Sequence, residues 1–390
     1  MHKRNHIVKS EAGQSQAAVN TKGTNETRSN NPITLVKKVL SLLRDRAPTP
    51  FYNANTYFVW EPCSKSHAEV VPGYCKLLLD AGYEVSVLIE PKRIDEGLFS
   101  NFKHERLHIN RLSKRATQKF FRKNKLAVSS GIIVTTAGKI SPNCDYNHAR
   151  ELFAPLKQGQ RVLLVEHDIK NGADLGTLTR DIITLRKTDY KNFNTTPVNP
   201  HYFGEFKAHQ KGTKTIFATV GAIRDKRRNS ELLISAVEEL HQKGFSNFSV
   251  LIIGKNDASI IPRYLKQYFL ILGRLTFQEL YKQIQSCDFL LPLLDPNKAT
   301  HKRYITTGTS GTFQLGLGFH KPVVIEQSFA PINSLNDSNS IVYDGNGNLR
   351  IAMEHAIRMT PAHYDSLQKA VAETARSIHI ESLENLKGLL

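Results

Sequence analysis

Short apolar runs rich in β-branched residues alternate with longer stretches of helical periodicity from residue 56 to residue 327. This alternation is typical of parallel sheets whose strands are joined by helices packed on both faces. A first set of predicted strands comprises residues 56–60, 83–90, 131–136, 161–167 and 181–185. A second set comprises residues 215–223, 248–255, 269–275, 288–294 and 321–327. The pattern therefore predicts an α/β fold with two Rossmann-like domains.

The break between the two sets falls near residues 195–207, where prolines and a glycine interrupt both periodicities. We therefore expect an N-terminal domain over residues 51–200 and a C-terminal domain over residues 201–390. In a doubly wound sheet, a ligand binds at the carboxyl ends of the strands. Two such edges are expected to face each other across a cleft, which is where the chemistry should lie.

The first 50 residues differ from the rest of the chain. Residues 1–31 are rich in Asn, Ser, Thr, Lys and Gln and bury too little apolar surface to offset chain entropy, so we expect them to be disordered. Residues 33–47 place apolar side chains on one helical face and Lys and Arg on the other. Such a helix either lies in an anionic membrane interface or packs on its own domain. There is neither an apolar run of membrane-spanning length nor a hydrophobic signal core, which predicts a cytoplasmic protein.

Composition and charge narrow the classes of partner. The chain has 390 residues with 40% hydrophobic content, enough to bury two cores, and its four cysteines show neither CxxC nor His-rich spacing. A zinc site and a disulfide framework are therefore not expected. The formal net charge of +18 indicates an anionic partner, namely nucleic acid, a membrane surface or a phosphorylated small molecule. The sequence has no nucleic-acid recognition motif and no aromatic residues interleaved with its basic clusters, which argues against nucleic acid.

Two junctions carry groups that suit a diphosphate. Residues 306–313 read TTGTSGTF and combine glycines with hydroxyls in a turn that is expected to follow an apolar strand and open a short helix. Such a turn exposes backbone N–H groups at the positive end of the helix. Residues 220–230 read VGAIRDKRRNS and place four cations before an N-cap candidate, Asn229. Each is more often an ordinary loop or a solvated basic face, but together they predict a clamp for a diphosphate.

Four segments together resemble the GT-B glycosyltransferases, and most closely their large retaining family four. They are TTPVNPHYF at 195–203, VGAIRDKRRN at 220–229, LGRLTFQELYKQIQSCDFLLPLL at 272–294 and GLGFHKPVV at 316–324. In that family, these segments form the link between the domains, the loop on the donor diphosphate, the region that contacts the nucleotide, and the helix and strand after the phosphate turn. The resemblance implies transfer of a sugar from a nucleoside-diphosphate sugar, without a further cofactor. It also implies that the final helical segment, residues 361–390, crosses back to the first domain.

The resemblance further implies a donor-binding set. Its members are Gly221, Arg224, Lys226, Arg228, Arg274, Leu275, Gly308, Thr309, Ser310, Gly311, Thr312 and Gln314. Family members usually carry two glutamates around the phosphate turn, whereas the corresponding positions here are Thr306, Thr307, Gln314 and Leu315. The amide of Gln314 can still accept a hydrogen bond from a ribose hydroxyl, but it lacks the charge. The donor and the stereochemical outcome therefore stay open.

The first domain offers the acid and base candidates. Residues 165–168 read VEHD, and His167 with Asp168 resembles the family's His-Asp pair at the cleft, although a strand-end histidine without a ligand is the structural alternative. If the reaction inverts configuration, His67 or Glu69 would remove the acceptor proton, whereas the resembling retaining mechanism needs no protein base. The chain contains no Asp-x-Asp motif, and its basic loop can stabilise a leaving diphosphate, so we predict that no metal is required.

The sequence supports one main prediction and three alternatives. We expect a cytoplasmic glycosyltransferase, peripheral on a membrane if residues 33–47 bind there, that acts on a glycan or lipid-linked acceptor. A nucleotide-sugar epimerase shares the fold and would use the same cleft. A catalytically silent protein that binds a nucleotide sugar or a glycan would fit the absence of both glutamates. A nucleic-acid binder would explain the charge but not the paired phosphate loops.

Overall fold

The computed structural model describes residues 50–62, 67–123, 129–136, 161–170, 182–188, 195–221, 228–255, 258–345 and 348–390. The chain divides into two compact units, Met1–Arg46 and Ala47–Leu390, and all of the described residues belong to the second unit. The predicted tail and the predicted helix over residues 33–47 lie outside the described residues, as do Arg224 and Lys226. Among the described residues, no helix has both the length and the apolar character needed to cross a membrane.

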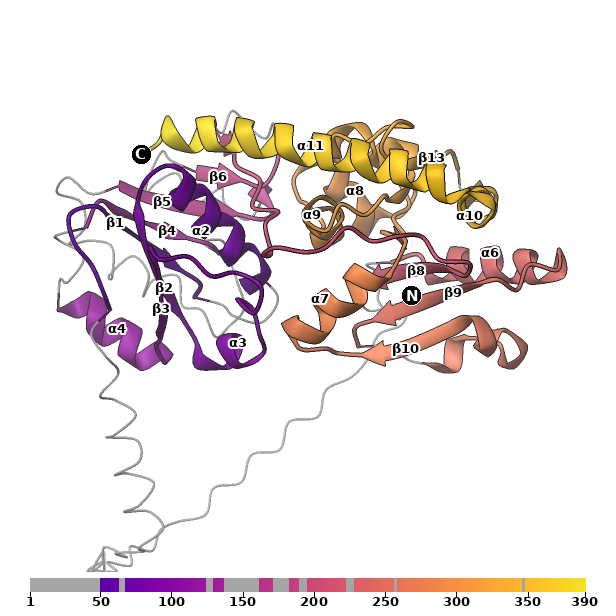
Figure 1. Ribbon diagram of the computed structural model, residues 1–390, viewed down its shortest axis with the longest axis horizontal. Helices are drawn as coiled ribbons and strands as arrows, with labels where there is room; N and C mark the ends of the chain where they lie inside the picture. Colours follow the sequence, from indigo (N-terminus) through magenta and orange to yellow (C-terminus); the bar gives the residue numbers. More distant parts are fainter. Residues whose placement is uncertain are drawn as a thin grey trace, which may run out of the picture. The chain divides into compact units, whose positions relative to one another are not determined.

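Seven parallel strands form the first sheet, in the order β3-β2-β1-β4-β5-β6-β7 (Figure 1). They are β1 (Thr56–Trp60), β2 (Glu84–Ile89), β3 (Leu107–Arg111), β4 (Gly131–Val134), β5 (Arg161–Glu166), β6 (Ile182–Thr184) and β7 (Thr195–Pro197). The strand order reverses between β1 and β4. The carboxyl ends of β1 and β4 therefore flank a topological switch point, and α/β proteins bind ligands at such a point.

Helices cover both faces of this sheet. Because successive side chains of a strand point to opposite faces, Val59 of β1 joins one core with Leu77 of α2 (Val71–Asp80), while Phe58 joins another. The second core contains Phe120 and Phe121 of α4 (Lys114–Arg122), and the rings of Phe58 and Phe120 lie 5.6 Å apart. A 3-10 turn, Ala68–Val70, precedes α2, and a short helix, α3 (Pro91–Asp95), follows β2. Burial on both faces explains why these strands are continuous apolar runs.

The second sheet has four parallel strands in the order β10-β9-β8-β11. They are β8 (Thr215–Val220), β9 (Phe248–Ile253), β10 (Phe269–Gly273) and β11 (Phe289–Leu290), and a separate parallel pair comprises β12 (Val324–Glu326) and β13 (Ile341–Tyr343). The helices of this half are α6 (Ser230–Gln242), α7 (Phe277–Ser286), α8 (Ala299–Thr306), α9 (Gly311–Gly318), α10 (Leu349–Arg358) and α11 (Pro361–Lys387). Polar side chains cap α6, α7, α9 and α11, each accepting a hydrogen bond from a backbone N–H of the first turn.

The predicted α/β architecture with parallel sheets is confirmed, and each of the ten predicted strands contains an observed one. The strands β3, β7 and β13 were not predicted. β3 and β7 are edge strands that are only partly buried and carry few apolar residues, whereas β13 is apolar but only three residues long. The expectation that the turn at residues 306–313 follows a strand is wrong. An amphipathic helix, α8, which buries His301 and Tyr304, intervenes after β11, so the turn joins two helices.

The long helix α11 contacts both halves of the described chain. Near its start, Tyr364 and Leu367 pack in the core that contains β13, and the Tyr364 hydroxyl donates to the Asp288 carbonyl at 3.1 Å. Near its end, the Ser382 hydroxyl accepts a hydrogen bond from the Asn199 N–H at 2.9 Å. Figure 1 shows α11 running from the neighbourhood of β13 towards α2. The helix therefore ties the segment after β7 to the second half of the chain.

Candidate functional site

The two loops predicted to hold a diphosphate meet in the structure. The guanidinium Nη2 of Arg228 lies 3.3 Å from the Ser310 hydroxyl and 3.4 Å from the Thr312 hydroxyl, at the start of α9. Arg228 is only 9% exposed, and its Nε and Nη2 also donate to the carbonyl of Val220, the last residue of β8. Gly221 follows with φ 125°, a conformation that favours glycine. The buried guanidinium of Arg228 therefore lies at the N-terminus of α9, so two groups that attract anions are adjacent.

Not every amide of the turn is available to a ligand. The N–H of Gly308 donates to Arg303, that of Thr309 to His167, and that of Thr312 to the Ser310 hydroxyl. Within the part of the chain that the structure describes, the N–H groups of Ser310 and Gly311 have no acceptor. Of the five amides from Gly308 to Thr312, packing has already used three, so those of Ser310 and Gly311 are the ones left for a phosphate oxygen among the described residues.

The same turn is bonded to the carboxyl end of β5. Asp168 and Gly308 form an antiparallel bridge, in which the Ile169 N–H donates to the Thr307 carbonyl at 2.9 Å and the Thr309 N–H donates to the His167 carbonyl at 3.3 Å. The predicted pair His167 and Asp168 therefore lies directly beside the predicted phosphate turn.

Two arginines also bind the turn and the residues after β5. Arg186, which follows β6, donates from Nη2 to the Gly308 carbonyl at 2.8 Å and to the Tyr304 carbonyl at 3.2 Å. Arg303 pairs with the Asp168 carboxylate at 3.6 Å. Sequence reasoning missed Arg186. The only available signal was its position just beyond the carboxyl end of a predicted strand.

His167 is held in one tautomer. Its Nε2 lies 2.8 Å from the Thr135 carbonyl, which can only accept, so Nε2 carries the proton and Nδ1 is left as an acceptor. Its ring stacks on that of His67 with centroids 4.0 Å apart. Burial, together with His67, lowers the pKa of His167 to about 3, so the ring is neutral at physiological pH. His167 can therefore receive a hydrogen bond from a sugar hydroxyl.

Two buried carboxyl groups flank this histidine. Glu61, at the end of β1, accepts hydrogen bonds from the hydroxyls of Thr135 and Thr136 at 2.6 and 2.7 Å, which makes it an anchor for the end of β4. Glu166 is 5% exposed, and burial raises its pKa to about 8. Its Oε2 has no hydrogen-bond partner among the described residues. Sequence reasoning did not single out Glu166, although it stands next to His167.

Glu69 reaches the start of α9. A Cβ built on Gly311 would lie 2.4 Å from the Glu69 Oε1, so this carboxyl group lies directly against Gly311 and would have to shift if the glycine were replaced. Burial raises the pKa of Glu69 to about 7. The two base candidates therefore lie close to the predicted site, His67 against the ring of His167 and Glu69 against Gly311.

Replacing Glu69 with glutamine is expected to make folding stability less dependent on pH. Because the pKa is raised from 4.5 to about 7 on folding, the folded chain retains a proton that the unfolded chain has released between these pH values. The stability contributed by the protonated carboxyl is complete below pH 4.5 and is lost as the pH rises to 7. Urea unfolding at pH 4.5 and at pH 7 measures this. Between these pH values, the free energy of unfolding should fall more for the wild type than for Glu69→Gln. The exposed Glu373→Gln should behave like the wild type, and an identical loss in all three proteins would contradict the prediction.

The remaining predicted donor residues are Arg274, Leu275 and Gln314. Gly254 N–H donates to the Gly273 carbonyl, and a Cβ on Gly254 would lie 2.7 Å from the Gly221 carbonyl, so the ends of β8, β9 and β10 adjoin. Arg274 and Leu275 follow at this edge. Gln314 lies elsewhere. It is two positions after Thr312 on α9, which is about 200° around the helix, and it faces a cavity that contains neither Arg228 nor Gly221.

Among the described residues, no group of three or more His, Cys, Asp and Glu side chains is arranged to hold a metal ion.

Comparisons with known proteins support the fold. No family model matches the sequence, and no curated protein matches it. AviGT4, a glycosyltransferase involved in avilamycin A biosynthesis, matches with a TM-score of 0.52 and 13% identity, over 85% of this chain and 97% of that one. HepE from Anabaena, solved in complex with UDP and glucose, matches with a TM-score of 0.51 and 10% identity, over 85% and 99% of the two chains. An α-glucosyltransferase solved with UDP and a 13-mer DNA matches with a TM-score of 0.51 and 13% identity, over 85% and 94%. This chain therefore has the GT-B fold, which it shares with these glycosyltransferases.

Proposed function

We propose that this chain is a glycosyltransferase that moves a sugar from a nucleoside-diphosphate sugar to a glycan or lipid-linked acceptor. One observation carries the proposal: Arg228 lies within 3.4 Å of the Ser310 and Thr312 hydroxyls, at a turn that is bonded to the carboxyl end of β5 beside His167. A diphosphate at this turn would meet a guanidinium, two unoccupied N–H groups and the positive end of α9. The donor sugar would then project towards His167.

The chemistry follows from charge that develops during the reaction. As the glycosidic bond breaks, the sugar gains oxocarbenium character and negative charge grows on the diphosphate. Arg228, with Arg224 and Lys226 of the same loop, would bind the leaving diphosphate more tightly than the intact donor and so lower the barrier. Because the sequence of this loop carries several cations and the chain lacks an Asp-x-Asp motif, we propose that the reaction needs no metal. The neutral His167 would accept a hydrogen bond from a hydroxyl of the sugar.

The nucleotide and the acceptor are proposed on different grounds. HepE and the α-glucosyltransferase were both solved with UDP, which makes UDP the first nucleotide to test. The acceptor class rests on the net charge of +18, which favours an anionic glycan or a lipid-linked acceptor at an anionic membrane surface. Residues 33–47, with their basic amphipathic pattern, would supply the contact with such a surface.

Thermal unfolding in the presence of UDP, GDP, ADP and their sugars tests the nucleotide site. A ligand that binds only the folded chain stabilises it by about 2.7 kcal/mol at a concentration 100 times its Kd. We expect UDP and at least one UDP-sugar to raise the melting temperature, and we expect release of UDP from that sugar to continue in EDTA. No shift with any nucleoside diphosphate would contradict the proposal. Binding without release or transfer would favour a silent binding protein, and an epimerised sugar would favour the epimerase.

A further inference from the structure

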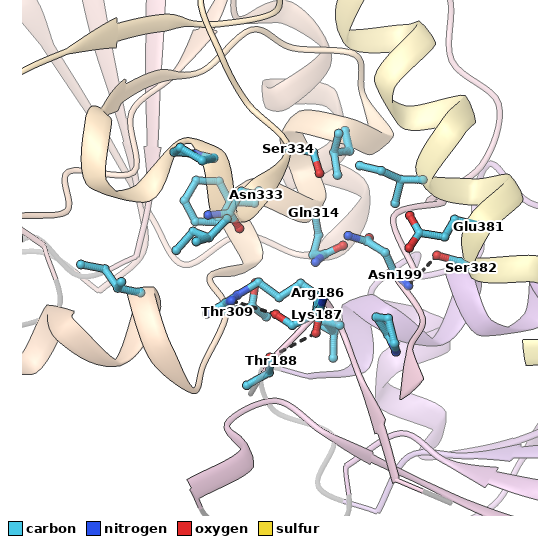
Figure 2. A pocket seen from close by; sticks show the side chains of 18 of the residues that line it. Arg186, Lys187, Thr188, Asn199, Thr309, Gln314, Asn333, Ser334, Glu381 and Ser382 are labelled. Carbon is cyan, nitrogen blue, oxygen red and sulfur yellow. Dashed lines mark hydrogen bonds between the residues drawn. The ribbon is translucent and has the colours of Figure 1, made fainter. Parts of the chain in front are cut away.

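A cavity adjoins the turn at Thr309, and Arg228 is not among the residues that line it. Its volume is about 560 Å³, within the range of small-ligand sites. Its walls come from the chain after β6 and β7, from α8 and α9, from residues 331–334 and from the end of α11 (Figure 2). Thr309 and Gln314 line it, whereas Arg228, Ser310 and Thr312 do not. The cavity is therefore distinct from the proposed diphosphate position.

A buried amide in this cavity has no partner. Gln314 is 1% exposed, and its Oε1 accepts no hydrogen bond from the residues that the structure describes. The Thr309 hydroxyl, which lines the same cavity, also has no partner among those residues. A buried acceptor that is left without a donor costs about 1–3 kcal/mol. Both groups would be satisfied by a ligand that brings hydroxyl groups, since a hydroxyl both donates and accepts.

The charges around the cavity argue against an anionic ligand. Arg186 lines it, but its N–H groups already donate to the backbone carbonyls of Gly308, Tyr304 and Lys187. Lys187 and Glu381 are both exposed, line the cavity and carry opposite charges. Arg186, Lys187 and Glu381 leave one net positive charge around the cavity, but Arg186 is already bonded to backbone carbonyls and Lys187 is exposed, so these residues do not form a site for a phosphate or a carboxylate.

Apolar side chains complete the lining. Phe313, Leu317, Ile305 and Ile378 contribute hydrophobic surface beside Gln314 and Thr309. A pyranose presents hydroxyl groups around its edge and C–H groups on its faces, so it matches a wall that combines amide and hydroxyl groups with an aromatic ring and aliphatic side chains. Figure 2 shows Gln314 among the polar side chains that border this space.

We propose that this cavity binds a neutral saccharide of one or two sugar units, whose hydroxyl groups donate to the Gln314 Oε1 and pair with the Thr309 hydroxyl. The site is separate from the nucleotide and does not depend on the identity of the donor.

Saturation-transfer NMR on the full chain without nucleotide tests this, with glucose, galactose, mannose, N-acetylglucosamine and maltose as probes. At least one of them should bind. Gln314→Leu and Thr309→Val should each lower the affinity for that saccharide by about tenfold, because each removes one hydrogen bond to the ligand. The half-buried Gln368→Leu on α11, outside the cavity, is the matched control and should leave the affinity unchanged.

The response to UDP distinguishes this site from the proposed function. Gln314→Leu should keep the wild-type melting shift with UDP, which also shows that this variant is folded; the melting temperature without ligand shows whether Thr309→Val is folded. Saccharide binding that is absent, or that survives both substitutions, would overturn the proposal. Loss of the UDP shift in Gln314→Leu would overturn it too, because Gln314 would then belong to the nucleotide site. A chain that binds the saccharide through Gln314 but no nucleoside diphosphate would contradict the proposed function and leave this site standing.

Discussion

Replacing Arg228 with methionine is expected to lower the rate of sugar transfer by about 10²–10³-fold, the usual cost of removing one preorganised group that stabilises developing charge. Arg228 is the cation that the structure places at the start of α9, with its Nη2 3.3 Å from the Ser310 hydroxyl. Its burial excludes water, so its charge is weakly screened and acts strongly on a nearby diphosphate. Steady-state kinetics with the UDP-sugar found by thermal shift measures the effect.

Two further variants separate catalysis from folding. Arg228 also donates to the Val220 carbonyl, so Arg228→Met is expected to lose some stability as well. Arg228→Lys keeps the charge but not the forked geometry, and it should recover part of the rate. Arg358→Met, at an exposed ion pair with Glu354, should leave the rate unchanged. A folded Arg228→Met protein with wild-type kcat/KM would rule out the proposed role of the guanidinium.

Replacing Gly73 or Gly318 with alanine is expected to destabilise the fold by about 3 kcal/mol or more, at the upper end of the cost of overpacking. The segment after β7 passes close to both glycines. A Cβ on Gly73 of α2 would lie 2.2 Å from the Pro200 carbonyl oxygen, and a Cβ on Gly318 of α9 would lie 2.2 Å from that of His201. These are backbone atoms and cannot move aside as a flexible side chain can. The clash should outweigh the gain of about 1 kcal/mol that alanine normally brings to a helix.

Urea denaturation of Gly73→Ala and Gly318→Ala measures the loss of stability, and Gly212→Ala is the control. A Cβ on Gly212 meets no atom within 4 Å, so its stability should stay within about 0.5 kcal/mol of the wild type. Stabilisation by Gly73→Ala or Gly318→Ala would show that the segment at residues 200–201 does not approach the helices this closely. Because this segment joins the two sheets, the same variants are expected to lower activity through a loosened junction.

Local patterns were enough to predict much of this molecule. The buried strands, such as β9 with its sequence FSVLII, stand out because both of their faces are covered and every position is apolar or small. The cap of α6 at Asn229 and the basic run before it marked one loop, and the glycines and hydroxyls of residues 306–313 marked the other. Partly buried edge strands such as β7 were missed for the opposite reason, since TTP has no apolar pattern.

Residue types and their periodicity act over a few neighbours along the chain, and for that reason they could indicate where strands lie and which side chains could bind a phosphate. They could not show which of those groups packing had already used. The Thr309 N–H is taken by His167, Arg186 donates to a carbonyl 122 positions away, and Gln314 lines a cavity that Thr312 does not reach. Each of these depends on contacts between distant segments. A hydrogen bond or a clash between such segments is settled only when the chain has folded and brought them together.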